Sequence, residues 1–333
     1  MVKAIALFSG GLDSCLAVRL VQEQGVKTEG LHFVSVFCRA APSSTSCNEA
    51  EKGAKLLGLP LTIYDSSQDL LEMVRNPKHG YGKNLNPCID CRINMLRRAA
   101  EHMREADAGF IVTGEVPGQR PMSQRRDAMA LIDRKAGVEG LVLRPLSARA
   151  LEPTVPEREG WVDREKLLAI SGRGRTEQME LARRFNIREY PTPAGGCLLT
   201  YETFSNKMRD LMNHGRFDLN NVELLKFGRY YRANAGTRII IGRDQRENDI
   251  LAGLAREGDW LVQTMDFKGP LTLVRGEGRE DAFRMAAELT ARYSQGREAE
   301  VLRVSVRKAG KDEEKIVEVA PADLDNYKQQ LIT

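Results

Sequence analysis

The chain has 333 residues, of which 42% are hydrophobic and 29% are charged, and its formal net charge is +4. Such a chain is globular and long enough for two or three domains, and its small net charge does not by itself indicate nucleic-acid binding. No apolar run approaches the roughly 20 residues that a membrane span needs. The first strand pattern starts so early that it leaves no room for an export signal. We therefore expect a cytoplasmic protein without membrane contact.

Short apolar strands alternate with helical patterns through the first 145 residues. This βαβα order predicts a Rossmann-like parallel sheet with helices on both faces, which binds ligands at the carboxyl edge of its strands. We place the end of this α/β domain at residue 200. Strands are expected at 4–8, 31–37, 61–64, 110–113 and 141–143, and the clearest helices at 14–24, 49–57, 92–104 and 177–185.

Residues 201–333 have a different pattern, in which antiparallel strands and helices are mixed. Two strand patterns at 229–232 and 238–241 are joined by Ala233-Asn234-Ala235-Gly236-Thr237, which favours a hairpin. The sequence therefore predicts a second, smaller α+β domain over 201–333. Its helices are expected at 203–212, 246–256 and 279–293.

The segment Ser9-Gly10-Gly11-Leu12-Asp13-Ser14 stands between the first strand and the first helix. Its glycines allow a tight turn, and the amides and positive dipole end of the helix suit a polyphosphate. An ordinary capped βα turn is the alternative interpretation. The segment resembles the SGGxDS signature of the PP-loop ATP pyrophosphatases, of the adenine nucleotide alpha hydrolase type, which cleave ATP to AMP and pyrophosphate. No Walker loop occurs in the chain.

The PP-loop resemblance implies several ligand contacts. ATP would lie on Ser9, Gly10, Gly11, Leu12, Asp13 and Ser14 with Mg²⁺ on its phosphates, and Asp13 would organise the metal or the pyrophosphate. The second strand would line the adenine pocket with His32 and Phe33.

A polar segment that follows the fourth expected strand runs from Thr113-Gly114-Glu115 through Gln119 to Gln124. A polar loop with a helix cap is one interpretation. The segment is also similar to an element of 4-thiouridine synthetases of transfer RNA that closes over the nucleotide and the target uridine. That similarity implies ATP contacts by Thr113, Gly114 and Arg144, and RNA contacts by Gln119, Arg120 and Gln124.

Cysteines stand at positions 15, 38, 47, 88, 91 and 197. Cys88 and Cys91 form a CxxC at a helix start, and Cys197 follows a segment rich in proline and glycine. A lone CxxC is compatible with half a zinc site, a pair of iron–sulfur ligands, a redox dithiol or two ordinary cysteines. We expect Cys15 to be buried, and we assign no role to Cys38 or Cys47.

The three cysteines at 88, 91 and 197 resemble those of PP-loop enzymes that sulfurate transfer RNA. In one branch, equivalents of Cys88 and Cys197 are catalytic, as a sulfur-carrying thiol and its resolving partner. In another branch, three cysteines hold a [4Fe-4S] cluster with one iron open, and Cys88, Cys91 and Cys197 would be its metal ligands here. A closed zinc site normally takes four ligands. We therefore favour the cluster, with zinc or a persulfide relay as alternatives.

The region from Lys207 to Arg246 contains nine basic and four acidic residues with interleaved aromatic residues. A solvated hairpin with core tyrosines is one interpretation. The region also weakly resembles RNA-binding domains of the NFACT type, and cations with aromatic faces suit structured RNA. The candidate RNA contacts here are Arg229, Tyr230, Tyr231, Arg232 and Arg243.

These resemblances imply an ATP-dependent tRNA sulfurtransferase that adenylates a uridine carbonyl oxygen and replaces it with sulfur. Its partners would be tRNA and a sulfur donor, which is sulfide, a cysteine desulfurase or a carrier protein. Related enzymes are often homodimers. One alternative is a PP-loop ligase that adenylates a small molecule and holds zinc, and another is an RNA-binding protein with a vestigial nucleotide site.

Overall fold

The computed structural model describes residues 2–38, 45–188, 190, 196–277 and 279–333, and only the backbone of residues 45–48. It divides into two compact units, Met1–Thr200 and Tyr201–Thr333. Within the described residues, no helix is both long and apolar enough to cross a membrane.

The first unit is built on the expected parallel sheet, whose order is β3-β2-β1-β4-β5. The chain moves outward from β1 to β3 and then returns to β4 on the other side of β1. Open α/β sheets bind ligands in the crevice at such a reversal, which here lies at the carboxyl ends of β1 and β4. The strands are β1 (Lys3–Leu7), β2 (Lys27–Val34), β3 (Leu61–Asp65), β4 (Phe110–Thr113) and β5 (Val142–Leu143).

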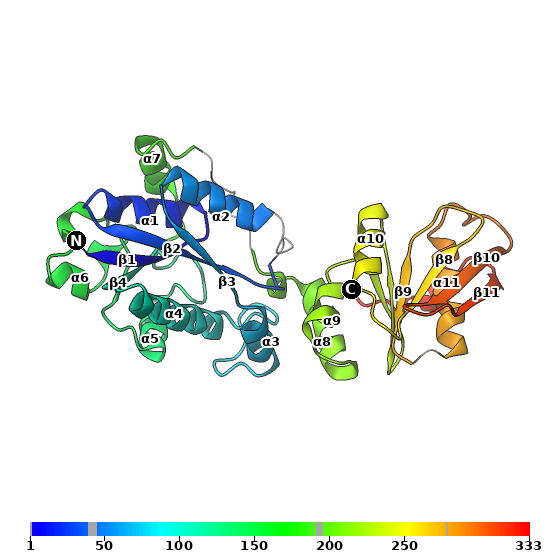
Figure 1. Ribbon diagram of the computed structural model, residues 1–333. Helices are drawn as coiled ribbons and strands as arrows, with labels where there is room; N and C mark the ends of the chain where they lie inside the picture. The colour runs from blue at the N-terminus through cyan, green and yellow to red at the C-terminus, as the bar shows by residue number, and fades with distance from the viewer. Residues whose placement is uncertain (1, 39–44, 189, 191–195, 278) are drawn as a thin grey trace. The chain divides into compact units, whose positions relative to one another are not determined.

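Helices cover both faces of this sheet, as predicted, with α1, α2 and α7 on one face and α3, α4 and α5 on the other (Figure 1). The two faces have separate cores because β1 alternates its side chains: Ala4 and Ala6 pack on one side and Ile5 and Leu7 on the other. The helices are α1 (Leu12–Gln22), α2 (Thr45–Leu56), α3 (Ser67–Arg75), α4 (Cys88–Glu105), α5 (Arg126–Ala136), α6 (Val155–Arg158) and α7 (Thr176–Arg184).

The second strand differs from its prediction, because it ends at Val34 instead of Phe37. The Ser67 hydroxyl accepts a hydrogen bond from the Val36 amide (2.8 Å), and the Cys38 amide donates to the Ser35 carbonyl (3.0 Å). These bonds turn residues 35–38 away from the sheet. The apolar run continues past the strand because Val36 and Phe37 are buried in the turn.

The second unit contains an antiparallel sheet in the order β11-β10-β8-β9-β7-β6. Its hairpin of β6 and β7 is confirmed, and α11 packs Phe283, Ala286 and Leu289 into the same core as Val262 and Val304. The elements are α8 (Glu202–His214), α9 (Leu219–Leu224), β6 (Arg229–Asn234), β7 (Thr237–Ile241), α10 (Gln245–Leu254), β8 (Trp260–Thr264), β9 (Thr272–Arg275), α11 (Glu280–Arg292), β10 (Leu302–Lys308) and β11 (Glu314–Val319).

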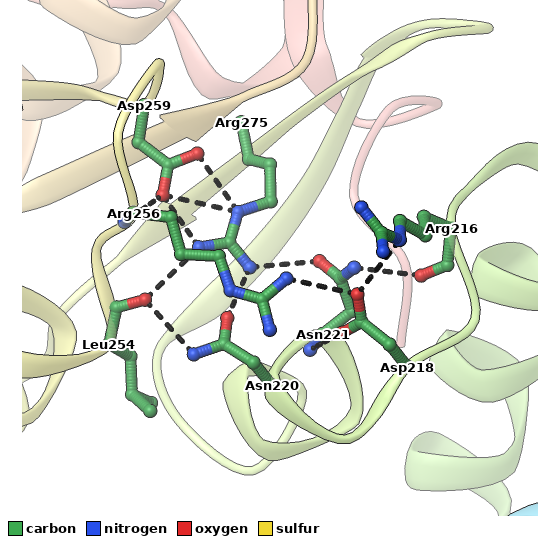
Figure 2. A network of polar contacts seen from close by, with 8 residues as sticks. All are labelled: Arg216, Asp218, Asn220, Asn221, Leu254, Arg256, Asp259 and Arg275. Atoms are coloured by element: carbon green, nitrogen blue, oxygen red, sulfur yellow. Dashed lines mark hydrogen bonds and ion pairs between the residues drawn. The ribbon is translucent and has the colours of Figure 1, made fainter.

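A buried arginine joins α9, α10 and the sheet of the second unit (Figure 2). Arg275 donates to both carboxylate oxygens of Asp259 (2.6–3.2 Å), to the side-chain oxygens of Asn220 (2.6 Å) and Asn221 (2.9 Å), and to the Leu254 carbonyl (3.1 Å). A buried guanidinium is tolerated only when its donors are satisfied in this way. We therefore regard this network as part of the domain's architecture.

Candidate nucleotide and thiol site

The loop after β1 has the geometry of a phosphate cradle. Gly10 has a φ of +74°, and a Cβ there would lie 2.6 Å from the Glu49 carbonyl oxygen, so the turn requires glycine. Leu12 anchors the start of α1 in the core, and the Ser14 hydroxyl donates to the Gly11 carbonyl (2.8 Å). Gly11 stands at the N-cap without a side chain to cap the helix. The first amides of α1 are therefore suited to an anion.

The loop after β4 touches the first turn of α1. A Cβ on Gly114 would lie 2.5 Å from the carbonyl carbon and oxygen of Asp13 and 2.6 Å from the Ser14 nitrogen. Only glycine permits this approach, because the clashing atoms belong to the backbone. The predicted neighbourhood of the two loops at one sheet edge is therefore observed.

Asp13 is the centre of the polar contacts in this crevice. Its Oδ2 accepts hydrogen bonds from Gln119 Nε2 (2.9 Å) and Arg175 Nη2 (3.4 Å). Its Oδ1 is buried and has no partner among the described residues. A buried carboxylate oxygen without a partner is costly, and it fits a ligand that brings a cation or a donor.

Sequence analysis missed Arg175, which stands immediately before α7. The signal for it was the glycine- and arginine-rich stretch Ser171-Gly172-Arg173-Gly174-Arg175, whose Gly172 amide donates to the Pro117 carbonyl (2.7 Å). This bond holds the stretch beside the loop that carries Gln119. The position of Arg175 therefore makes it a candidate for binding phosphate, in addition to the first amides of α1.

His32 and Phe33 follow the phosphate loop on the neighbouring strand. His32 is buried, which lowers its pKa and keeps the imidazole neutral, and its Nδ1 lies 2.8 Å from the Phe8 carbonyl oxygen, to which it donates. Its Nε2 is then an acceptor, and it is buried without a partner among the described residues. Phe33 is half-buried, with its ring centroid 5.4 Å from that of Tyr64. The adenine contacts stay a prediction.

Arg144 lies within a polar network of the protein. Its guanidinium is buried and makes two hydrogen bonds of 2.8 Å to Asp133 and one of 3.1 Å to Glu115. The phosphate contact by Arg144 stays a prediction, and these three hydrogen bonds are the contacts that the structure shows. The Thr113 hydroxyl is likewise turned inward and donates to Glu115 Oε2 (3.2 Å).

Glu115 joins two arginines from different elements. Its other oxygen accepts a hydrogen bond from Arg92 Nε (2.7 Å), and Arg92 directly follows Cys91 on α4. Burial alone would raise the pKa of Glu115, but the charges and hydrogen bonds of Arg92 and Arg144 outweigh it and lower the pKa to about 2. The CxxC helix is therefore tied to the loop that touches Asp13.

Three cysteines that the sequence singled out come together. The Leu85 amide donates to the Leu199 carbonyl (3.2 Å) and the Asn84 side chain donates to the Thr200 carbonyl (2.8 Å), so the segment before Cys88 lies against the segment after Cys197. Cys197 interacts electrostatically with both Cys88 and Cys91. A fourth cysteine, Cys38, interacts with Cys91 and Cys197 as well. Sequence analysis gave Cys38 no role, because its spacing from the other cysteines matches no ligand motif.

The donor set fits a thiophilic metal centre. Burial raises the pKa of Cys88, and it raises the pKa of Cys91 and of Cys197 to about 12, so metal binding would have to displace their protons. Within the described ranges, no three His, Cys, Asp or Glu side chains are arranged to hold one metal ion. Tetrahedral zinc, with Zn–S bonds of about 2.3 Å, would require sulfurs about 3.8 Å apart.

The candidate RNA contacts of the first unit surround the crevice. Gln119 is engaged with Asp13, Arg120 is exposed, and Gln124 is buried with its carbonyl oxygen unpartnered among the described residues. Arg120 also interacts electrostatically with Cys88. The RNA contacts of these three residues stay predictions.

The hairpin of the second unit does not present its tyrosines to solvent. Tyr230 and Tyr231 are 1% and 2% exposed, and their hydroxyls bond Asp210 and Tyr293. The prediction that their rings stack on bases is wrong in this structure, because both rings are core residues. Arg232 is paired with Asp210.

Two arginines of the same predicted set lie at or near the surface. The Arg229 guanidinium lies 4.1 Å from the centroid of the Tyr293 ring. The Arg243 side chain is 53% exposed and bonds Glu247. Arg243 therefore remains a surface candidate for phosphate contact.

The fold is that of an α/β domain of the PP-loop type, joined to an antiparallel-sheet domain. Residues 1–152 match the family model described as thiamine biosynthesis protein (ThiI). Residues 228–331 match the model of the NFACT protein RNA binding domain. The chain is therefore similar to ThiI in its first domain and to the NFACT RNA-binding domain in its second, and each match covers less than half of the chain.

Curated relatives are similar only to part of the chain. The tRNA-specific 2-thiouridylase of Tropheryma whipplei (strain Twist) is 28% identical over 112 residues, which cover 29% of this chain and 31% of that protein. The tRNA-specific 2-thiouridylase of Pelobacter propionicus is 30% identical over 122 residues, which cover 34% of this chain and 33% of that protein. The chain thus spans about a third of the length of these relatives.

Among solved structures, a 4-thiouridine synthetase in complex with RNA and ATP aligns with a TM-score of 0.40 and 23% identity. The alignment covers 59% of this chain and 44% of that chain.

The Glu115 network predicts how stability depends on pH. Because the folded-state pKa of Glu115 lies below its usual value of about 4.3, its carboxylate stabilises the fold above that pH, and this contribution is lost as the pH falls toward 2. The Glu115→Gln variant should lose about 3–5 kcal/mol at neutral pH, because the buried Arg144 and the half-buried Arg92 both lose a charge partner. Urea unfolding over a pH series measures both effects.

The exposed pair of Arg125 and Asp127 offers a matched control, since solvent screens it. Asp127→Asn should change the unfolding midpoint little at any pH. An equal loss in the two variants, or a Glu115→Gln variant whose stability still falls as steeply below pH 4, would contradict the assignment.

Proposed function

We propose that this chain is an ATP-dependent tRNA sulfurtransferase that thiolates uridine. One observation carries the proposal: the contacts of Gly114 and Glu115 join the helix with the CxxC to the phosphate loop, where one Asp13 oxygen has no partner among the described residues. A site that activates the uridine with ATP and a group of thiols that delivers sulfur must lie close together, and here both lie at the same edge of the sheet. The matches to the ThiI family, to tRNA-specific 2-thiouridylases and to an RNA-binding domain support the substrate class.

The first step activates the uridine. The ATP phosphates would bind the amides at the start of α1, and Asp13 would hold the Mg²⁺ that neutralises their charge. Arg175 and Gln119 exchange their bonds to Asp13 for bonds to the phosphates. The uridine carbonyl oxygen then attacks the α-phosphorus, and the bond to pyrophosphate breaks. Adenylation is needed because a carbonyl oxygen is a poor leaving group.

The second step replaces the activated oxygen. A sulfur nucleophile bonds to the carbonyl carbon, and AMP leaves with the former carbonyl oxygen. Cys88, Cys91 and Cys197 would hold a [4Fe-4S] cluster, which when bound would supply a site for the incoming sulfur. The donor is a sulfide source of the class of free sulfide, a cysteine desulfurase or a carrier protein. The NFACT-type domain holds the RNA.

The direct test uses the full chain, purified anaerobically, with ATP, Mg²⁺, tRNA and sulfide. We expect AMP and pyrophosphate in equal amounts, both dependent on tRNA, and a uridine derivative heavier by the difference between sulfur and oxygen. Mass spectrometry of the digested RNA detects the product. If AMP formation does not depend on RNA but increases with a small-molecule acceptor, and the protein contains zinc, the ligase alternative is favoured.

The Arg175→Ala variant tests the phosphate contacts. Loss of a charge-assisted hydrogen bond to phosphate costs about 1.5–3 kcal/mol, so the Kd for ATP should rise about 10- to 100-fold. Equilibrium binding of ATP to the full chain measures this. Arg173 is exposed on the same stretch, so Arg173→Ala is the matched control and should bind ATP normally. Equal weakening in both variants would assign the effect to overall charge.

The Arg243→Ala variant tests the RNA surface of the second unit. Removing one phosphate contact should weaken tRNA binding regardless of sequence and lower the salt dependence of log Kd by about one unit. Arg284→Ala is the control, because Arg284 is also exposed and paired with a glutamate four residues on. If the salt dependence is unchanged in Arg243→Ala, or decreases equally in both variants, Arg243 does not contact the RNA.

A further inference from the structure

Three arginines stand in a row across the sheet of the second unit. Arg238 on β7 lies directly opposite Arg232 on β6 and Arg275 on β9 in the antiparallel register. Directly opposed residues point to the same face of a sheet, with Cβ atoms about 4.5–5.5 Å apart. The adjacent Ile239 packs into the core with α11, so the row lies on the other face. Three positive charges are therefore neighbours on that face.

The middle arginine of the row has no counter-charge. Arg232 pairs with Asp210 on α8, and Arg275 pairs with Asp259. In the part of the chain that the structure describes, no carboxylate forms an ion pair with Arg238, which is 6% exposed and whose Nε has no hydrogen-bond partner there. Because a buried charge without a partner is costly, this position suits an anion from outside the chain.

The surroundings of Arg238 disfavour its charge further. Burial and the positive charges of Arg232 and Arg275 lower the pKa of Arg238, and Tyr230 only partly opposes this shift. Tyr230 is not an anion, because its hydroxyl keeps its proton and donates it to Asp210 (2.7 Å). A bound anion would relieve the repulsion among the three guanidinium groups.

The loop between α8 and α9 brings further positive charge to Arg238. A Cβ on Gly215 would lie 2.8 Å from Arg238 Nη1, so this guanidinium lies against the loop. The side chain of the next residue, Arg216, is 85% exposed. Figure 2 shows that Asp218 is shared by Arg216 (3.4 Å) and Arg256 (2.9 Å). Arg216 therefore has only part of a counter-charge, and it stands at the surface beside Arg238.

The ion pairs of this region leave positive charge in excess. Five arginines share three aspartates, namely Arg216, Arg232, Arg238, Arg256 and Arg275 with Asp210, Asp218 and Asp259. A phosphodiester carries one negative charge, and its oxygens match the donors of a guanidinium group. The excess therefore fits a phosphate group.

We propose that Arg238 and Arg216 bind one phosphate of the RNA backbone at this loop. The inference rests on the proposed function for RNA as the partner. Arg216 meets the phosphate at the surface, and Arg238 supplies the buried donors that hold its oxygen atoms. Free phosphate has the same chemistry, and the experiment separates the two sources.

The experiment measures tRNA binding to the full chain over a salt series for the wild type, Arg238→Met and Arg216→Ala. Each variant loses charge-assisted hydrogen bonds to phosphate, so we expect the Kd to rise about 10-fold and the salt dependence of log Kd to fall by about one unit. Because both residues hold the same phosphate, the double variant should bind little worse than Arg238→Met alone. Arg303→Ala is the matched control, because Arg303 is also exposed and paired with an aspartate, and it should bind tRNA normally.

Unfolding in urea separates binding from a structural role of Arg238. Methionine keeps a long, unbranched apolar side chain at this position and removes the unpaired charge. The unfolding midpoint of Arg238→Met should therefore equal or exceed that of the wild type. A lower midpoint would show that the guanidinium supports the fold, and it would overturn the inference.

The remaining outcomes distinguish the inference from the proposed function. If inorganic phosphate raises the unfolding midpoint of the wild type but not of Arg238→Met, while both bind tRNA equally, the site takes free phosphate and not RNA. If the wild type binds tRNA and neither variant is weakened, the inference falls and the proposed function stands. If the wild type itself does not bind tRNA, both fall.

Discussion

The buried carboxylate of Glu115 is the constraint on which the candidate site depends. It bonds Arg92 on the CxxC helix and Arg144 near the end of β5, and it stands one residue after Gly114, which touches Asp13. A carboxylate placed between two guanidinium groups repays its own desolvation only if the geometry is held closely. The network therefore fixes the cysteine helix relative to the phosphate loop.

Two glycines also hold the phosphate loop in place, because each allows another backbone segment to approach it closely. Gly10 lies against the backbone of Glu49 and Ala50, and Gly114 lies against that of Asp13 and Ser14. The carboxyl ends of β1 and β4 are thereby closed into one crevice. Asp13 projects into it with one oxygen bonded to Gln119 and Arg175 and the other without a partner among the described residues. This arrangement carries the proposed binding of ATP and Mg²⁺.

The thiol group combines segments that are far apart in the sequence. Backbone bonds hold the segment at residues 84–88 against the one at 197–200, and the turn after β2 adds Cys38. Burial raises the pKa of Cys91 and of Cys197 to about 12. The apolar surroundings disfavour negatively charged thiolates. A metal centre that binds there must therefore supply the positive charge that stabilises them.

The sequence by itself determined the sheet and the phosphate loop, and it singled out Cys88, Cys91 and Cys197 as one group. Hydrophobic periodicity, glycine spacing and the CxxC motif are local signals of these features. Only the tertiary structure decided that Arg144 and the tyrosines of the hairpin are internal, and that Arg175 and Cys38 reach the site. Those outcomes depend on which distant partners, such as Asp133, Asp210, Asp13 and Cys197, the fold brings beside each side chain, and no local spacing encodes that.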